Sequence, residues 1–304
     1  MSEAENETPE VSEAEQQPAQ QQSATKKKTA MIVAIVVIVA ALIGGGAYWY
    51  VNYQVPHQQA VDAFNTACEA LDARTAKVDE AIAALQAVQA GDDKPLDAAT
   101  DEAASNAIGQ AQAAKQFAPE MPSGTDEINA AAAEVDKMGD YTETLNALAA
   151  AQKALEDSIA QLKQVTNPSE AFVIQRITGL PNITGVEAVT ESNDPNGKLN
   201  KAGGYTATVY FSSDLVDQSS VYASEGYTGI VAVGNDGGGT VEVYSSVEDA
   251  EKRSTYLGAF DGSILSSGSH EVLGTCVLRT SDKLTASQQQ TLTQEVKEAL
   301  IRLE

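Results

Sequence analysis

The chain has 304 residues, a formal net charge of −24 and two cysteines, Cys68 and Cys276. An acidic surface of this kind repels the phosphates of nucleic acids and anionic lipid headgroups, so nucleic acid is excluded as a partner. Two cysteines are too few for a disulfide scaffold, and each is expected to be a buried apolar residue. A disulfide between Cys68 and Cys276 is one alternative, and two free thiols are the other. The length suggests two ordinary domains with additional segments.

The N-terminal segment is polar and acidic. Residues 1–25 contain six glutamates, no basic residue and almost no apolar residue. Such a segment cannot bury enough apolar surface to offset the entropy lost on ordering. We therefore expect residues 1–28, including the lysines Lys26, Lys27 and Lys28, to form a disordered acidic tail.

An apolar segment follows the tail. Met31 to Ile43 is an unbroken apolar run, and residues 29–51 carry no charge. This length suffices for a helix across the roughly 30 Å of membrane hydrocarbon. The sequence therefore predicts a single transmembrane helix over residues 29–51.

The flanks of this helix predict its orientation. The three lysines precede it, whereas the next basic residue on the other side is Arg74. The positive-inside rule therefore places the N-terminus in the cytoplasm and the later domains outside the cell, in the cell membrane. Trp49 and Tyr50 lie at the outer end, where aromatic rings favour the headgroup layer.

A cleaved signal peptide is the alternative interpretation of the apolar segment. Gly45, Gly46 and Ala47 resemble the small residues of a cleavage site. The long polar region before the apolar run and the aromatic cluster after it favour an uncleaved anchor.

Residues 56–166 are rich in alanine, with 30 alanines and four glycines. Pro56 is expected to begin a first long helix and Gly91 to end it. Further helices are expected over about 96–117, from about 123, and over 141–162 after an interruption at Gly139. Two series of apolar residues at heptad spacing, three and four residues apart, predict an antiparallel helical-bundle or coiled-coil stalk. The first series comprises Val61, Phe64, Cys68, Leu71, Thr75, Val78, Ile82 and Leu85.

A heptad series can pack within one chain or against a second copy. The short turns between the expected helices favour packing within the chain, and a homo-oligomer remains the alternative.

Residues 167–304 have a different composition, with fifteen glycines and most of the remaining aromatic residues. Pro168 marks the boundary, because a proline stops a helix that runs into it. The pattern predicts an α+β domain, a mixed β-sheet with helices on one face. The expected helices begin after the capping residues Ser169, Ser246 and Thr285, and the expected strands cover 183–190, 205–211, a hairpin of 229–233 with 240–244, and a central strand over 270–279.

Several short stretches of this domain carry a family resemblance. They include Asn-Pro-Ser-Glu at 167–170, Asn-Asp-Pro-Asn-Gly at 193–197, Asp-Gly-Gly-Gly at 236–239 and Phe-Asp-Gly at 260–262. With them, the domain resembles the C-terminal domain of a family of uncharacterised, membrane-anchored surface proteins of Gram-positive bacteria. The likeness extends through the stalk and the anchor, and it implies no activity.

The sequence does not favour an enzyme. The two histidines, His57 and His270, form no zinc-ligand pattern with the cysteines, and no Gly-x-Ser-x-Gly motif is present. No cofactor and no metal centre are therefore predicted.

Two places in the C-terminal domain are candidate ligand sites. Asp194, Asn196 and Asn200 form an oxygen-rich loop that either binds Ca²⁺ or is a plain turn. Arg279, at the end of an expected buried strand, either meets an anionic ligand or pairs with a nearby acid at the rim.

These features lead to two hypotheses of different classes. In the first, a helical stalk presents an extracytoplasmic binding or sensing module to an envelope component, a glycan or a protein. In the second, the chain is a structural or assembly protein of the cell envelope that acts through self-association of its stalk.

Overall fold

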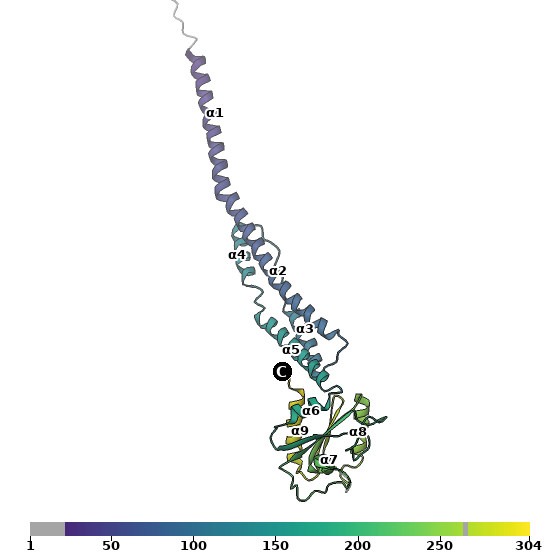
Figure 1. Cartoon of the computed structure of the whole chain (residues 1–304). Coiled ribbons are helices and arrows are strands. Elements are labelled where there is room, and N and C mark those ends of the chain that lie inside the picture. The colour runs from purple at the N-terminus through teal and green to yellow at the C-terminus, as the bar shows by residue number, and fades with distance from the viewer. Residues whose placement is uncertain (1–21, 264–266) are drawn as a thin grey trace, which may run out of the picture. The chain divides into compact units, whose positions relative to one another are not determined.

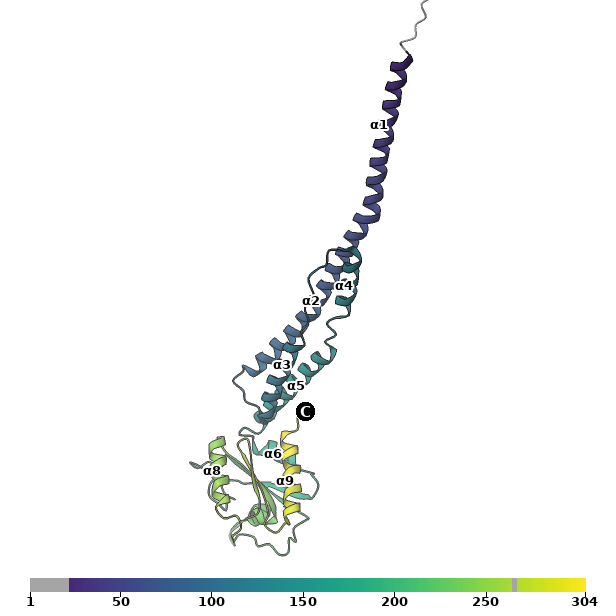
Figure 2. The same cartoon turned by 180° about the vertical axis from the view of Figure 1, so that it is seen from behind.

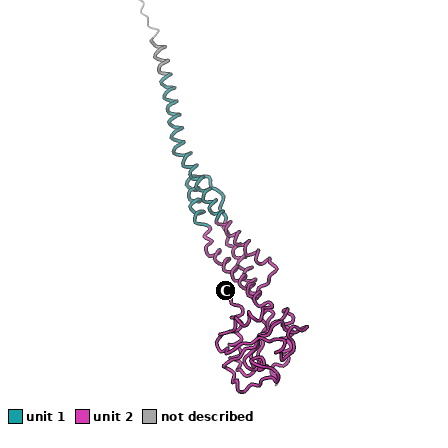
Figure 3. The backbone as a smooth tube through the Cα atoms, viewed as in Figure 1, with its two compact units in different colours: residues 1–73, 117–138 teal, residues 74–116, 139–304 magenta. Residues whose placement is uncertain are grey.

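The computed structural model describes residues 22–263 and 267–304, with side chains from residue 31 onward. The expected acidic tail therefore lies outside the described residues as far as residue 21. Two compact units can be distinguished (Figure 3): the first comprises the chain up to Ala73 with Phe117–Met138, and the second comprises Arg74–Gln116 with Gly139–Glu304.

The long apolar helix near the N-terminus is α1, Gln22–Trp49 (Figure 1). It begins earlier than expected, because residues 22–28 are helical and not part of a disordered tail. Alanine and lysine favour a helix, and no proline or glycine lies between Gln22 and Ile43. The apolar side chains from Met31 to Ile43 are exposed, as a membrane anchor or a signal sequence requires. Trp49 and Tyr50, at its end, are also exposed.

A short π-helix, Tyr50–Gln54, connects α1 to α2, Val55–Gln89. The N–H of Val55 donates to the carbonyl of Tyr50, five residues earlier. Pro56 has no N–H to donate to Asn52, which accounts for the wider turn before it.

In the first unit, the first half of α2 packs on α4, Thr125–Lys137. The buried residues at their contact are Ala60, Phe64, Ala67 and Leu71 of α2 and Ile128, Ala132 and Val135 of α4. A hydrogen-bonding contact of 3.2 Å between His57 Nδ1 and Thr125 Oγ1 lies beside this cluster.

In the second unit, the last part of α2 packs against α3, Ala99–Ala114, and α5, Thr142–Gln164. Their shared core contains Val78, Ile82, Leu85, Ala104, Ile108, Ala111, Leu148 and Leu155. The hydroxyl of Tyr141 accepts a 2.8 Å bond from the N–H of Gln116 and lies 3.2 Å from Thr75 Oγ1. Helix α3 ends at Ala114, three residues before the expected end, and Gly139 separates α4 from α5 as expected.

The sheet of the second unit has five strands in the order β1-β2-β3-β5-β4. These are β1 Ile183–Ala188, β2 Ala207–Ser213, β3 Gly238–Val243, β4 His270–Leu273 and β5 Cys276–Thr280. Each pairing is antiparallel. The prediction of a mixed sheet is therefore wrong.

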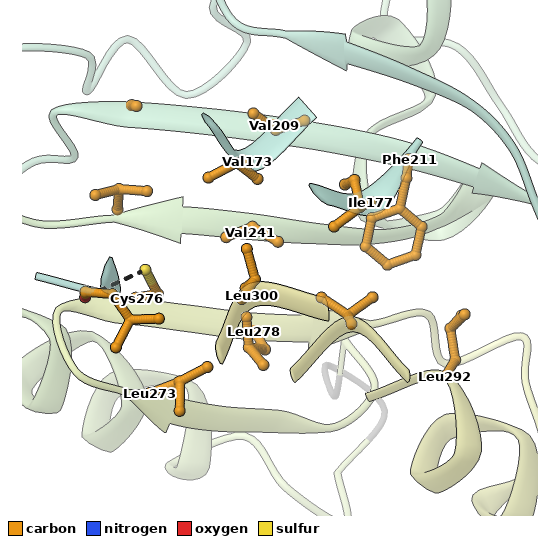
Figure 4. Packing of buried hydrophobic residues seen from close by; sticks show 14 of the residues in the cluster. Val173, Ile177, Val209, Phe211, Val241, Leu273, Cys276, Leu278, Leu292 and Leu300 are labelled. Carbon is orange, nitrogen blue, oxygen red and sulfur yellow. Dashed lines mark hydrogen bonds between the residues drawn. The ribbon is translucent and has the colours of Figure 1, made fainter. Parts of the chain in front are cut away.

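Helices cover both faces of this sheet, so the prediction of one covered face is also wrong (Figures 1 and 2). On one face, α6, Glu170–Ile177, and α9, Ala286–Ile301, pack on Val241, Val243 and Leu278 (Figure 4). On the other face, α8, Val247–Gly258, and α7, Gly229–Val233, pack on Tyr210, Tyr244 and Val277. The strands carry large apolar groups at both odd and even positions, so both faces need a cover.

Two expected strands have other structures. Residues 229–233 form α7, because the carboxylate of Glu187 accepts the N–H groups of Ile230 at 2.6 Å and Val231 at 3.3 Å and so caps a helix. The expected central strand over 270–279 is a hairpin of β4 and β5 that turns at Gly274, whose φ is 59°. Three capping residues are confirmed: Ser169, Ser246 and Thr285, the last in a capping box with Gln288.

Candidate functional site

A cavity of about 580 Å³ opens between helix α8, the end of strand β3 and the loop that precedes β2. For brevity we call it the Arg253 cavity. Its lining residues are Asn196, Lys198, Gly203, Gly204, Tyr205, Tyr244, Asp249, Lys252, Arg253 and Tyr256. Aromatic, cationic and hydrogen-bonding groups therefore meet in one hollow of the second unit.

Helix α8 places four of these residues on one side. Ser246 caps the helix by accepting the N–H of Asp249 at 3.2 Å, which sets where the helix begins. Asp249, Lys252, Arg253 and Tyr256 are spaced three and four residues apart, so they share one face. The guanidinium of Arg253 lies 5.6 Å from the centre of the Tyr256 ring, within the range of a cation–π contact.

A buried carboxylate lies behind Arg253. Glu242 of β3 is fully buried and accepts two bonds from Arg253, Nε to Oε2 at 2.7 Å and Nη2 to Oε1 at 2.9 Å. It also accepts 2.7 Å from Arg279 Nη1 and 2.8 Å from the Tyr244 hydroxyl. Burial alone would raise the pKa of Glu242, but the bonds and charges of the two arginines outweigh burial and lower it.

Tyr205 and Tyr244, two tyrosines of the cavity, stay neutral. Burial, with the nearby charge of Glu242, raises the pKa of Tyr244. Burial and the bond to Asp194 raise the pKa of Tyr205 in the same way. Both hydroxyls therefore act as hydrogen-bond donors to a carboxylate at physiological pH.

Asp194 shapes the loop beside the cavity. Its Oδ1 accepts the Tyr205 hydroxyl at 2.5 Å and the N–H of Asn196 at 3.1 Å, and its Oδ2 accepts the N–H of Leu199 at 2.8 Å. Burial would raise the pKa of this carboxyl, yet these hydrogen bonds lower it. Both oxygens are thus engaged by the protein itself, as in a tight turn.

The four predicted ligand residues lie in three different settings. Asn196 lines the cavity and donates to the Tyr210 hydroxyl at 3.0 Å. Asp194 and Arg279 lie behind it. Asp194 binds the lining residue Tyr205 directly, whereas Arg279 binds Glu242, which in turn binds the lining residue Arg253. Asn200 lies outside the lining, and its N–H donates to the carbonyl of Tyr205 at 2.9 Å.

The calcium interpretation of this loop gains no support. Among residues 31–263 and 267–304, no group of three or more His, Cys, Asp and Glu side chains could hold a metal ion. For Arg279, the structure bears out pairing with an acid, but the acid is buried Glu242 and not a residue at the rim.

Sequence reasoning missed Glu242, Arg253 and Tyr256. The available signal was Glu242, a charged residue in a run of apolar and β-branched residues from Thr240 to Tyr244. A charge at such a position needs a buried partner. The partner could not be identified, because Arg253 comes from a helix eleven residues later.

A second polar row lies beside α8, from Ser254 within the helix to Asp261 after its end. Ser254 Oγ is 2.9 Å from His270 Nδ1, and His270 Nε2 is 3.4 Å from Asp261 Oδ2. The three residue types are those of a hydrolytic triad, but the Ser254 hydroxyl stands within a helix and none of the three lines the Arg253 cavity. We interpret the row as a connection between β4 and α8.

No protein-family model, no curated protein and no solved structure matches this chain. The resemblance to Gram-positive surface proteins therefore stays a prediction.

Proposed function

We propose that this chain is a membrane-anchored binding protein whose C-terminal α+β domain holds a small ligand in the Arg253 cavity. The observation that carries the proposal is the cavity itself. Its volume of about 580 Å³ falls in the usual range of ligand pockets, about 300–1,000 Å³. Aromatic surfaces and a few convergent polar groups are also typical of such pockets.

The support behind the cavity favours a binding role. Glu242 and Asp194 bind lining residues directly, and Arg279 holds Glu242 in place from behind. A site whose side chains are already held loses less entropy when its ligand binds. No residue of the lining set is arranged as an activated nucleophile, so we propose binding and not catalysis.

The test uses the whole chain in lipid nanodiscs and measures thermal unfolding against a panel of small molecules. A ligand at about a hundred times its dissociation constant should stabilise the domain by about 2.7 kcal/mol. Tyr256→Ala should abolish the shift, since this ring lines the cavity. Tyr222→Ala is the matched control, because Tyr222 is 91% exposed and does not line the cavity. A ligand that binds both variants equally would place the site elsewhere.

We also propose that α1 is an uncleaved single-pass anchor, with the N-terminus in the cytoplasm and the later domains outside. The three lysines before the apolar run and the exposed rings of Trp49 and Tyr50 after it support this orientation. N-terminal sequencing of the mature protein decides between the two interpretations. A mature chain that starts near Ala47 would make α1 a signal peptide.

Self-association of the stalk remains a separate hypothesis, with less support. Phe64 and Leu71 of the heptad series pack on α4, and Val78, Ile82 and Leu85 pack on α3 and α5. These residues of the heptad series are thus covered within the chain, as the favoured interpretation of the series predicts.

A further inference from the structure

We infer that the ligand of the Arg253 cavity is a hydroxyl-bearing organic anion, a sugar acid or a sugar phosphate, whose anionic group pairs with Arg253 and Lys198. This inference rests on the proposed function and adds the chemical class of the ligand.

The buried cluster behind the cavity has more positive than negative charge. Arg253 and Arg279 both pair with the one carboxylate of Glu242, and the second nitrogen of Arg279 donates to the neutral hydroxyl of Ser267 at 2.8 Å. Two guanidinium groups therefore share a single acid. A partly buried charge without a counterion is costly, so an anion beside the cluster would be stabilised.

Arg253 is the group through which this charge reaches the cavity. Its side chain is 24% exposed, whereas those of Arg279 and Glu242 are 8% and 0% exposed. Nε and Nη2 are bound to Glu242, and no described residue accepts a hydrogen bond from Nη1. One face of the guanidinium fork is thus available to an oxyanion, the group that such forks bind best.

Lys198 adds a second cation to the lining of the cavity. It lines the cavity from the loop shaped by Asp194, and it forms no ion pair with any residue that the structure describes. Lys252, on α8, contacts Glu248 at 2.9 Å and Asp249 at 3.6 Å. In a chain of net charge −24, such a gathering of cations around one hollow is a local exception.

The one acid in the lining explains why the ligand should carry hydroxyl groups. Asp249 accepts bonds from Ser246 Oγ at 2.9 Å and Ser245 Oγ at 3.3 Å and pairs with Lys252, so its charge is compensated. Its remaining acceptor capacity suits a hydroxyl donor, as does the amide of Asn196. A ligand with hydroxyl groups and one anionic group satisfies both kinds of lining residue.

The size of the cavity and the exposed Tyr256 ring exclude a bare ion as the sole occupant. A cavity of about 580 Å³ is far larger than one phosphate, which would leave the exposed ring of Tyr256 without a contact. This ring provides an apolar face for the C–H surface of a sugar, next to the polar groups that orient it.

The experiment is titration calorimetry on the full chain in nanodiscs of uncharged lipid. The probes are glucuronate, glucose 6-phosphate, inorganic phosphate and glucose. We expect at least one of the two anionic sugars to bind at least tenfold more tightly than glucose and than inorganic phosphate. Its affinity should fall as salt is raised from about 50 to 500 mM, because the pairing is partly exposed.

Variants of the cationic residues locate the anionic group. Lys198→Glu should weaken the anionic sugar about fivefold or more, since it reverses a charge at the cavity wall. Lys201→Glu is the matched control: it makes the same charge change at an exposed lysine of the same loop that does not line the cavity, and it should leave the affinity unchanged. Arg253→Lys keeps the positive charge but removes the planar guanidinium fork, so it tests whether the fork is needed for binding. Circular dichroism is the check on folding.

The outcomes separate this inference from the proposed function. Tighter binding of glucose than of either anionic sugar, or equal losses in Lys198→Glu and Lys201→Glu, would overturn the anionic class while the cavity remains a binding site. Binding of none of the four probes would overturn the inference. The proposed function would fail as well if, across a broad panel of small molecules, the shift in thermal unfolding were the same for Tyr256→Ala as for the unchanged chain.

Discussion

Arg253 and Glu242 form a two-point ion pair, with Nε on Oε2 at 2.7 Å and Nη2 on Oε1 at 2.9 Å. The pair joins helix α8 to the middle of the sheet and fixes the only acid among the buried groups of β3. It links the stability of the domain to the shape of its cavity, because the same arginine faces both.

The Glu242→Gln variant should lose about 3–5 kcal/mol of unfolding free energy, because it leaves two arginines without their buried counterion. Chemical denaturation measures the loss. Glu248→Gln is the control, since its pair with Lys252 is exposed and should contribute less than about 1 kcal/mol. Replacing Glu242, Arg253 and Arg279 together by Leu, Met and Met should restore part of the loss. A Glu242→Gln variant as stable as the unchanged chain would contradict the role given to the cluster.

Acid should destabilise the domain through Glu242. The pKa of this carboxyl is lowered in the folded state, so its contribution is fully present above the ordinary glutamate value of about 4.3 and is lost as pH falls toward the folded value. Unfolding free energy measured between about pH 6 and pH 3 should decline on the acid side. The decline should be shallower in Glu242→Gln, and equal slopes would argue against Glu242 as its source.

The Asp194→Ala variant should lose about 2–3 kcal/mol, because the Tyr205 hydroxyl and the N–H of Leu199 lose their acceptor. Asp214→Ala serves as the control, since Asp214 is exposed and its side chain accepts no hydrogen bond from a described residue. Added Ca²⁺ should leave the melting temperature of the unchanged chain where it is. A calcium-dependent rise that disappears in Asp194→Ala would revive the metal interpretation of this loop.

Cys276 should resist alkylation in the folded protein. It is fully buried, and burial raises the pKa of its thiol to about 12, so almost no thiolate exists at pH 8. Iodoacetamide labelling of a Cys68→Ser variant, followed by mass spectrometry, should detect modification only after denaturant is added. Rapid labelling without denaturant would show that the strand β5 opens readily.

The Leu85→Ala variant should cost about 2–5 kcal/mol, because Leu85 is fully buried between α2, α3 and α5. Val88→Ala, at a partly buried position of the same helix, should cost less than about 1.5 kcal/mol. Sedimentation of both variants should give the same association state as the unchanged chain. Dissociation of an oligomer on Leu85→Ala would instead show that the heptad series binds a second copy.

Local signals in the sequence determined much of the architecture. The apolar run near the N-terminus, the heptad spacing of α2 and the caps at Ser169, Ser246 and Thr285 each depend on neighbouring residues along one helix. Their physical causes, side-chain periodicity and the free N–H groups of a helix start, act over a few residues and can therefore be recognised without a fold.

Tertiary structure alone decided the sheet and the site. Residues 229–233 form a helix because Glu187 caps it, and Glu187 lies on a strand some forty residues earlier. Helices cover both faces of the sheet because its strands carry apolar side chains on both faces. The Arg253 cavity likewise depends on Glu242, Arg253 and Arg279, which come from two strands and a helix. A buried charge is stable only beside its partner, and which partner it meets is settled when distant segments pack together.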